Sequence, residues 1–450
     1  MKERIYLISL GCAKNLVDSE HMLGILNQRG YSVVSDLEEA DLAIVNTCGF
    51  IQSAAEEAIE TILRVAEKKA AGYLKNLVVA GCLVQRYGLK LRKHIPEVDA
   101  WLGPGEIAKI ADIADSVTRG QGQEAPIHLG RPLFLADHRT PRLYGTPFYS
   151  GYLKIAEGCS HRCSFCTIPS LRGPYRSRKI DSLVMETESM VEGGVKEINL
   201  IAQDTTMYGR DLGEGYGLED LLEEMLRVKH ISWIRLLYCH PQGVTDRLLD
   251  LLDGDNAVCP YLDVPFQHVN REILRRMGRE PARQDPRQLV ERIKTRTRNV
   301  SLRTTLMVGF PGETQEIFQE LCDFVSQGYF DHVGAFVYSP EKGTMAARMK
   351  DKVEADVARE RLDILMRIQA DISLKKNREM IGNVIPVLNE GVHPETDLLL
   401  RGRSQRMAPD VDSHVIMNAG EGPIGDIVQV RVTDAHEYDL IGEILQVLLL

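Results

Sequence analysis

Three cysteines lie within a span of eight residues in the middle of the chain. Cys159, Cys163 and Cys166 follow the spacing C-x3-C-x2-C, directly after a β-rich run at 152–156. Iron–sulfur clusters are held by cysteine thiolates and usually take four of them. Three ligands in so short a segment therefore indicate a cluster with one iron left open. An open coordination position is typical of catalytic rather than structural metal sites.

A zinc site is the alternative interpretation of the same cysteines. Zinc needs a fourth cysteine or histidine within about two to five residues, and none follows Cys166. His161 lies inside the loop, where its geometry is poor for completing a tetrahedron. The spacing therefore favours an iron–sulfur site.

The motif resembles the signature of radical S-adenosylmethionine (SAM) enzymes, with Phe165 as the aromatic residue before the last cysteine. The resemblance implies that SAM chelates the open iron and is cleaved reductively to a 5′-deoxyadenosyl radical. It also implies that Gln203 and Asp204 stand where this superfamily binds the methionyl amine of SAM. Four flanking arginines are suited to attract an anionic or carboxylate-bearing substrate: Arg162, Arg172, Arg176 and Arg178.

Three more cysteines are dispersed through the first hundred residues, each just after a short apolar run. They are Cys12, Cys48 and Cys82, which follow the runs 5–10, 42–45 and 77–80. A helical pattern at 55–66 separates the second and third runs. Alternating strands and helices predict a parallel, doubly wound sheet, in which ligands bind at the carboxyl ends of the strands. Three thiolates on that edge would bind a second cluster; alternatively, they are three ordinary buried cysteines.

Length and composition describe a globular protein of several domains. The chain has 450 residues, 44% of them hydrophobic, and at ~150 residues per domain this predicts about three domains. We expect no membrane span, because no apolar run reaches the required ~18 residues, and no signal peptide is visible. Cysteines kept as thiolates indicate a reducing, cytoplasmic location. Cys239, Cys259 and Cys322 are expected to pack as small hydrophobic residues.

The rest of the chain divides by pattern into an α/β fold of three parts. Glycine and proline interrupt 118–148, which predicts a linker between a domain at 1–117 and a core at 149–380. Six apolar runs in the core alternate with helical segments and predict a partial (β/α)6 barrel: 152–156, 197–201, 233–237, 261–264, 303–308 and 332–337. Residues 381–450 hold five short strand-like runs, which predict a small β-barrel of the oligonucleotide-binding kind.

Together the three parts resemble a methylthiotransferase from end to end, with an N-terminal methylthiotransferase domain, a radical SAM core and a TRAM domain. The resemblance implies two 4Fe–4S clusters per chain. The cluster at the closely spaced cysteines would cleave SAM, and the cluster at Cys12, Cys48 and Cys82 would deliver the sulfur. SAM would serve as methyl donor and as radical source, and an electron-donor protein would be a partner.

Two branches of this family differ in substrate. One modifies an adenosine in tRNA, and the other modifies the β-carbon of an aspartate in the small-subunit ribosomal protein S-twelve. Residues 201–209 resemble the second branch, because the tRNA branch typically reads Gln-Asn-Val-Asn after the strand. Independently, residues 381–450 carry four arginines, no lysine and eleven acidic residues, a net charge of −7. This charge repels phosphates and attracts a basic protein, so we expect a ribosomal protein as substrate, with tRNA as the alternative.

A different class of function is a non-catalytic RNA-binding protein built from a zinc knuckle and a small barrel. This alternative predicts zinc without iron, a colourless preparation and RNA affinity that falls steeply with salt.

Overall fold

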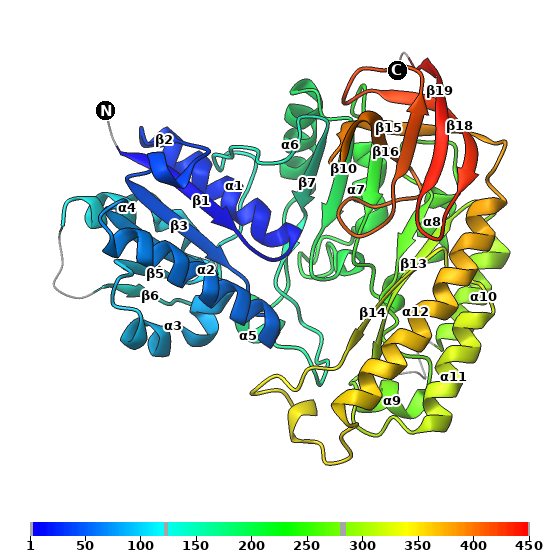
Figure 1. Ribbon diagram of the computed structural model, residues 1–450, viewed down its shortest axis with the longest axis horizontal. Coiled ribbons are helices and arrows are strands. Elements are labelled where there is room, and N and C mark those ends of the chain that lie inside the picture. The colour runs from blue at the N-terminus through cyan, green and yellow to red at the C-terminus, as the bar shows by residue number, and fades with distance from the viewer. Residues whose placement is uncertain (1–2, 121–124, 280–284, 449–450) are drawn as a thin grey trace.

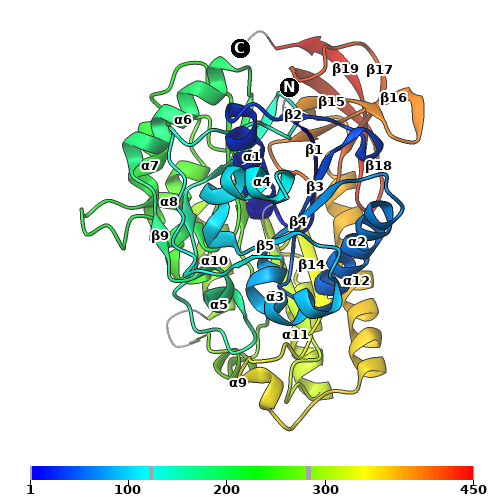
Figure 2. The ribbon, with the colours of Figure 1, turned by 90° about the vertical axis from the view of Figure 1, so that its left-hand side faces the viewer.

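The computed structural model describes residues 3–120, 125–279 and 285–448. An N-terminal α/β unit lies beside a central unit of strands and helices, and a C-terminal β-barrel packs on one end of the central unit (Figure 1). Turned by 90°, the N-terminal unit lies in front of the central strands (Figure 2). Among the described helices, none combines the length and the apolar character that a membrane span requires.

The N-terminal unit is a six-stranded parallel sheet in the order β2-β1-β3-β4-β5-β6. Its strands are β1 (Arg4–Ser9), β2 (Ser32–Val33), β3 (Leu42–Thr47), β4 (Asn76–Gly81), β5 (Ala100–Leu102) and β6 (Ile127–His128). Its helices are α1 (Ala13–Gln28), α2 (Gln52–Ala70), α3 (Cys82–His94) and α4 (Ile110–Thr118). The predicted doubly wound parallel sheet is confirmed. β6 lies within the segment 118–148 and adds a strand to the edge of this sheet.

Alternation along the central strand explains why helices cover both faces. Ile44 of β3 packs with α1 and α4 on one face, whereas Ala43 and Val45 pack with α2 and α3 on the other. Successive side chains of a strand point to opposite faces. A strand buried on both sides therefore reads as an unbroken apolar run, as 42–45 does.

The central unit carries six parallel strands in chain order, in two sheets of three, β7-β10-β11 and β12-β13-β14. The strands are β7 (Ser150–Lys154), β10 (Glu197–Ile201), β11 (Trp233–Leu236), β12 (Tyr261–Asp263), β13 (Ser301–Val308) and β14 (His332–Val337). A parallel bridge pairs Ile234 of β11 with Val258, three residues before β12. The predicted partial barrel of six strands is confirmed.

Helices cover the outside of these strands. All of them contribute to one large apolar core except the helix at 271–276, whose buried side chains lie in a smaller cluster. The helices are α6 (Ile180–Glu192), α7 (Leu218–Met225), α8 (Asp246–Leu252), α9 (Arg271–Arg276), α10 (Pro286–Arg296), α11 (Gln315–Ser326) and α12 (Ala355–Arg378). A short hairpin of β8 (Ala156–Glu157) and β9 (Arg176–Ser177) frames the segment that contains α5 (Ile168–Arg172).

The C-terminal strands close into a barrel in the order β15-β16-β17-β19-β18. They are β15 (Val384–His393), β16 (Thr396–Ser404), β17 (Val415–Ala419), β18 (Ile427–Ala435) and β19 (Leu440–Val447). Val387, Val415 and Val428 fill its interior. Closure leaves no free sheet edge for unwanted pairing, and it confirms the predicted small barrel.

Candidate functional site

The three dispersed cysteines meet at the carboxyl edge of the N-terminal sheet. Cys12 follows β1, Cys48 follows β3, and Cys82 begins α3 after β4. Because β1, β3 and β4 are neighbours in the sheet, their ends bring the three thiols to one place. All three are free; Cys12 is exposed, Cys48 half-buried and Cys82 buried.

Surrounding groups affect these thiols unequally. Burial raises the pKa of the Cys48 thiol and raises that of Cys82 to about 12. Partial desolvation also acts to raise the pKa of the Cys12 thiol, but the charges of Lys14 and Arg172, with two backbone N–H groups, hold it below the ordinary value of 9.0. A negative charge on Cys12 in turn raises the pKa of Cys48 and Cys82. Three thiolates at this edge therefore require a cation among them.

The second trio lies in an irregular loop between β8 and α5, beside the carboxyl ends of the barrel strands. Backbone hydrogen bonds fix this loop: Cys159 N donates to Gly173 O over 3.0 Å, and Ser164 N donates to Met277 O over 2.8 Å. Burial raises the pKa of Cys159 to about 11 and that of Cys166 to about 12. Near neutral pH these two thiols lose their protons only to a metal.

The residues expected to bind SAM lie close to this loop. Phe165 is half-buried and packs against an apolar cluster that includes Met277 and Phe310. Gln203 and Asp204 follow β10, and Asp204 is buried. Asp204 Oδ2 lies 2.6 Å from Nε2 of His161, which stands between the cysteines. Asp204 therefore ties the cysteine loop to the end of β10.

Asp204 and His161 belong to a small polar cluster. Asp204 Oδ1 accepts hydrogen bonds from Thr206 N over 2.9 Å and Thr206 Oγ1 over 2.6 Å. The ring of His161 stacks on that of His240 with 4.1 Å between centroids. Although burial raises the pKa of Asp204, the hydrogen bond from His161 is the largest of the effects that hold it below its ordinary value. Asp204 is therefore a carboxylate that organises its surroundings.

The edge of the N-terminal sheet faces the mouth of the partial barrel. Lys14 of α1 lies with Nζ 3.2 Å from the ring centroid of Tyr238, which follows β11. On the opposite side, Arg86 of α3 pairs with Glu341 after β14 at 2.8 Å. The N-terminal domain thus spans the mouth from the end of β11 to the end of β14.

Two residues at the mouth have strained backbones. Tyr238 and Gln267 follow β11 and β12 with φ of 62° and 70°, in the left-handed region that non-glycine residues rarely adopt. Such strain clusters at active sites and ligand-binding positions. Its location marks the carboxyl ends of these strands as the functional face of the barrel.

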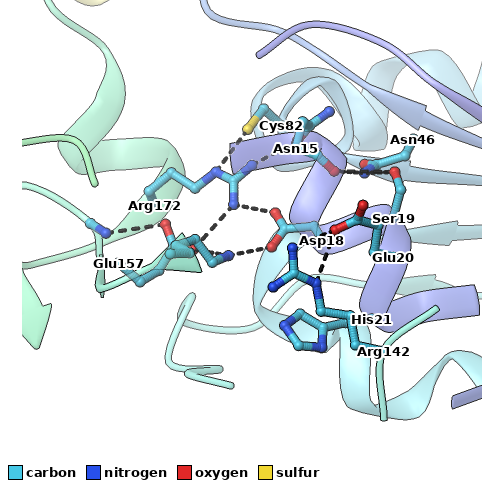
Figure 3. A network of polar contacts seen from close by, with 12 residues as sticks. Asn15, Asp18, Ser19, Glu20, His21, Asn46, Cys82, Arg142, Glu157 and Arg172 are labelled. Atoms are coloured by element: carbon cyan, nitrogen blue, oxygen red, sulfur yellow. Dashed lines mark hydrogen bonds and ion pairs between the residues drawn. The ribbon is translucent and has the colours of Figure 1, made fainter. Parts of the chain in front are cut away.

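A buried network links Cys82 and helix α1 of the N-terminal unit to Arg172 and Glu157 of the segment that carries the second trio (Figure 3). Arg172, the last residue of α5, donates from Nε to Cys82 Sγ over 3.1 Å and from Nη2 to Asn15 Oδ1 over 2.7 Å. Arg172 also pairs with Asp18 of α1 and Glu157 of β8. Lys154 of β7 pairs with the same two carboxylates.

The charges of this network compensate one another in the interior. Its four charged side chains are at most 7% exposed, and each buried charge requires a partner. Although burial raises the pKa of Glu157, the charges of Lys154 and Arg172 hold it well below the ordinary value of 4.5.

Two of the four flanking arginines differ from the prediction that they attract a substrate. Arg172 and Arg178 are buried, and Arg178 pairs with Glu186 of α6 at 2.6 Å. Their charges are thus engaged by internal acids instead of facing a substrate. The contact between Arg172 and Cys82 joins residues 90 positions apart, so no local pattern in the sequence indicates it.

Family models match all three parts of the chain. Residues 4–103 match the uncharacterized protein family UPF0004, residues 153–325 the radical SAM superfamily, and residues 381–445 the TRAM domain. A solved structure of the radical S-adenosylmethionine methyltransferase TsrM from Kitasatospora setae, with cobalamin and a 4Fe–4S cluster bound, is 18% identical, with a TM-score of 0.58 over 77% of each chain. At this identity the likeness concerns the fold alone.

Curated relatives match nearly the whole chain. The ribosomal protein uS12 methylthiotransferase RimO of Syntrophotalea carbinolica is 48% identical over 444 residues, which cover 99% of this chain and 97% of that protein. The protein of the same name from Geobacter sulfurreducens is also 48% identical, over 99% of each chain. The resemblance expected from the sequence is confirmed, and the chain belongs to the radical SAM family of ribosomal protein uS12 methylthiotransferases.

Proposed function

We propose that this protein inserts a methylthio group at the β-carbon of an aspartate in the small-subunit ribosomal protein S-twelve. One observation carries the proposal: the sheet edge with three cysteines faces the barrel mouth with three more, and Arg172 and Lys14 cross between them. Placing sulfur on an inert C–H carbon requires a carbon radical and a sulfur atom within bonding distance. Two facing sites meet both requirements.

We infer that each trio holds one 4Fe–4S cluster through thiolates: Cys12, Cys48 and Cys82 in one, Cys159, Cys163 and Cys166 in the other. All six are free cysteines. In the part of the chain that the structure describes, only His161, Asp204 and His240 form a group of three metal-binding side chains with ligand atoms within 4.8 Å of one another. Tetrahedral zinc, with Zn–S bonds of ~2.3 Å, would draw its sulfurs to ~4 Å. In each cysteine trio at least one pair of sulfurs is more than 4.8 Å apart, which favours clusters, in which each thiolate binds its own iron.

SAM is proposed to bind beside the loop of Cys159, in contact with Phe165, Gln203 and Asp204. When bound, SAM and the two clusters would supply the radical and the sulfur for the reaction. The role of the protein's own residues is to position these groups. Asp204 holds His161 and with it the cysteine loop, and Gln203 lies next to it at the end of β10.

The charge of the C-terminal barrel favours a basic protein over nucleic acid as the substrate. Arg403 is buried against Glu197 at 2.6 Å, and Arg406 pairs with Asp331 at 3.3 Å. These two arginines are engaged by acids of the core, but Asp412 and Glu390 of the same region are held in ion pairs as well, so the acidic excess of residues 381–450 persists. Nucleic-acid binding depends on cationic neutralisation of phosphates, so the tRNA reaction is not favoured.

A mass assay on two substrates tests this function. The anaerobically reconstituted protein receives SAM, a reductant and sulfide, with a peptide of the ribosomal protein in one sample and transcribed tRNA in the other. We expect the peptide to gain the mass of one SCH2 unit at its aspartate and the tRNA to gain none. The same peptide with asparagine at that position is the control. Methylthiolated tRNA beside an unmodified peptide would reverse the assignment.

A single glycine tests the cluster proposed at the N-terminal trio. Gly11 has φ of +92°, and a Cβ there would lie 2.6 Å from Cys48 Cβ and 3.1 Å from Cys48 Sγ. We expect Gly11→Ala to lower the iron content from about eight to about four per chain, because the added methyl displaces Cys48. The matched control is Gly72→Ala, which has φ of +83° and nothing within 4 Å. Equal iron in both variants would argue against a cluster beside Cys48.

An electron-donor protein would supply the electrons for SAM cleavage, and six free cysteines held for metal suit a reducing cytoplasm. We place the domain boundaries at 1–117, 118–148, 149–380 and 381–450. Separate apolar cores under the N-terminal sheet, the partial barrel and the closed barrel support this division.

A further inference from the structure

Arg172 connects the radical SAM core to a proposed cluster ligand of the other domain. It lies on α5, six residues after Cys166, yet its Nε donates to Cys82 Sγ over 3.1 Å. The side chain is 3% exposed, so no bulk water competes for this hydrogen bond. A guanidinium that donates to a thiolate makes a charge-assisted bond, which is stronger than a neutral one.

The surroundings hold Arg172 in this position from three other sides. Nη2 donates to Asn15 Oδ1 over 2.7 Å, and Nη1 pairs with Asp18 and with Glu157. Asn15 and Asp18 lie on α1, which begins directly after Cys12. The guanidinium is therefore fixed by the same helix that follows another proposed ligand, and it has no free rotation away from the sulfur.

The two trios differ in the donors that reach their sulfurs. Cys166 Sγ accepts a hydrogen bond from the backbone N–H of Ile168 over 3.4 Å. Cys82 Sγ accepts a shorter bond from a full positive charge. Hydrogen bonds to sulfur and nearby net charge both set the reduction potential of an iron–sulfur cluster.

We propose that Arg172 is a positioning residue that raises the reduction potential of the N-terminal cluster. This inference rests on the proposed function. Reduction adds negative charge to a cluster and its thiolates. A positively charged donor at Cys82 therefore stabilises the reduced form more than the oxidised form, which raises the reduction potential. Because Arg172 belongs to the segment that carries the other trio, the potential also depends on the docking of the two domains.

The test measures the potential of the N-terminal cluster alone. In the full chain, Cys159, Cys163 and Cys166 are replaced with alanine, so that only the N-terminal trio binds iron. The midpoint potential is then measured by anaerobic redox titration with EPR detection. Arg172→Gln is expected to shift the reduction equilibrium at least tenfold toward the oxidised form, which is 59 mV lower for a one-electron couple. Arg172→Lys keeps the positive charge but loses the planar guanidinium with its several N–H donors. We therefore expect a smaller shift of the equilibrium in the same direction.

Lys154→Gln is the matched control. It removes one cation from the same buried network, because Lys154 pairs with Asp18 and Glu157, but it leaves the donor at Cys82 in place. We expect less than half of the shift seen for Arg172→Gln. An unchanged potential in Arg172→Gln, or an equal shift in Lys154→Gln, would overturn the inference.

Loss of iron in a variant or in the parent is also informative. If Arg172→Gln does not retain iron, Arg172→Lys decides the question, and an unshifted potential there rejects the proposal. If the parent chain with the three alanines binds no iron, the cluster proposed at Cys12, Cys48 and Cys82 is rejected, and with it the proposed function. A parent that binds iron, with variants that do not shift, rejects the role of Arg172 alone.

Discussion

A chain with alanine at Cys12, Cys48 and Cys82 is expected to retain about four irons and to cleave SAM, but to transfer no methylthio group. The reason is spatial. These cysteines end strands of the N-terminal sheet, whereas the loop of Cys159 is held by the core, through Gly173 and Met277. Loss of the first trio therefore leaves the second intact. Iron content, the yield of 5′-deoxyadenosine and the mass of the substrate peptide measure the three properties separately.

The reciprocal variant completes this test. Alanine at Cys159, Cys163 and Cys166 is expected to leave about four irons, no SAM cleavage and no product. Cys322→Ala is the matched control, because Cys322 is a buried cysteine of α11 in the apolar core; it should retain both clusters and full turnover. Methylthio transfer by the variant that lacks the N-terminal trio would remove that trio from the reaction.

Strand patterns made most of the fold predictable. Each of the six strands predicted in the core corresponds to an observed strand, and β10 and β14 match their predicted ranges at both ends. β2, β5 and β6, which span only two or three residues each, have no counterpart among the strands predicted from the sequence. So few residues carry no measurable period, and β6 lies among glycines and prolines, where its pairing depends on β5.

The candidate site was predictable as far as its chemistry is local in sequence. Cysteine spacing and the positions of cysteines after strands are visible in the chain itself, and the sheet order then brings Cys12, Cys48 and Cys82 together. The contact of Arg172 with Cys82 is not predictable in this way. It depends on how two domains dock, and an arginine near a metal motif looks the same in sequence whether it faces solvent or a sulfur.

Glu197→Gln is expected to destabilise the attachment of the C-terminal barrel to the core. Glu197 of β10 accepts hydrogen bonds from Arg403 Nη2 over 2.6 Å and from Arg235 Nε over 2.9 Å. All three side chains are at most 1% exposed. Removing one partner of a buried ion pair costs about 3–5 kcal/mol, because it leaves the opposite charge uncompensated. Here two arginines lose their shared carboxylate.

Trp233 reports on this interface. It is buried with Leu388 and Ile427 of the barrel, and Trp101→Phe removes the other of the two tryptophans. Urea unfolding of the reduced, metal-free Trp101→Phe chain, followed by Trp233 fluorescence, gives the free energy of unfolding with and without Glu197→Gln. Glu224→Gln, which removes a surface pair with Arg227, is the control and should change the free energy by less than about 0.5 kcal/mol.

The pH dependence of the free energy of unfolding distinguishes the contribution of the charge of Glu197 from that of its packing. Burial raises the pKa of this carboxyl, but the charges of Arg403 and Arg235 outweigh it and hold the pKa well below the ordinary value of 4.5. A carboxyl with a depressed folded pKa stabilises the protein above its unfolded pKa, and this stability is lost as pH falls through the folded value. The free-energy difference between the parent and Glu197→Gln should therefore be constant near neutral pH and shrink below about pH 4.3. A difference that stays constant down to pH 3 would assign the effect to packing instead of charge.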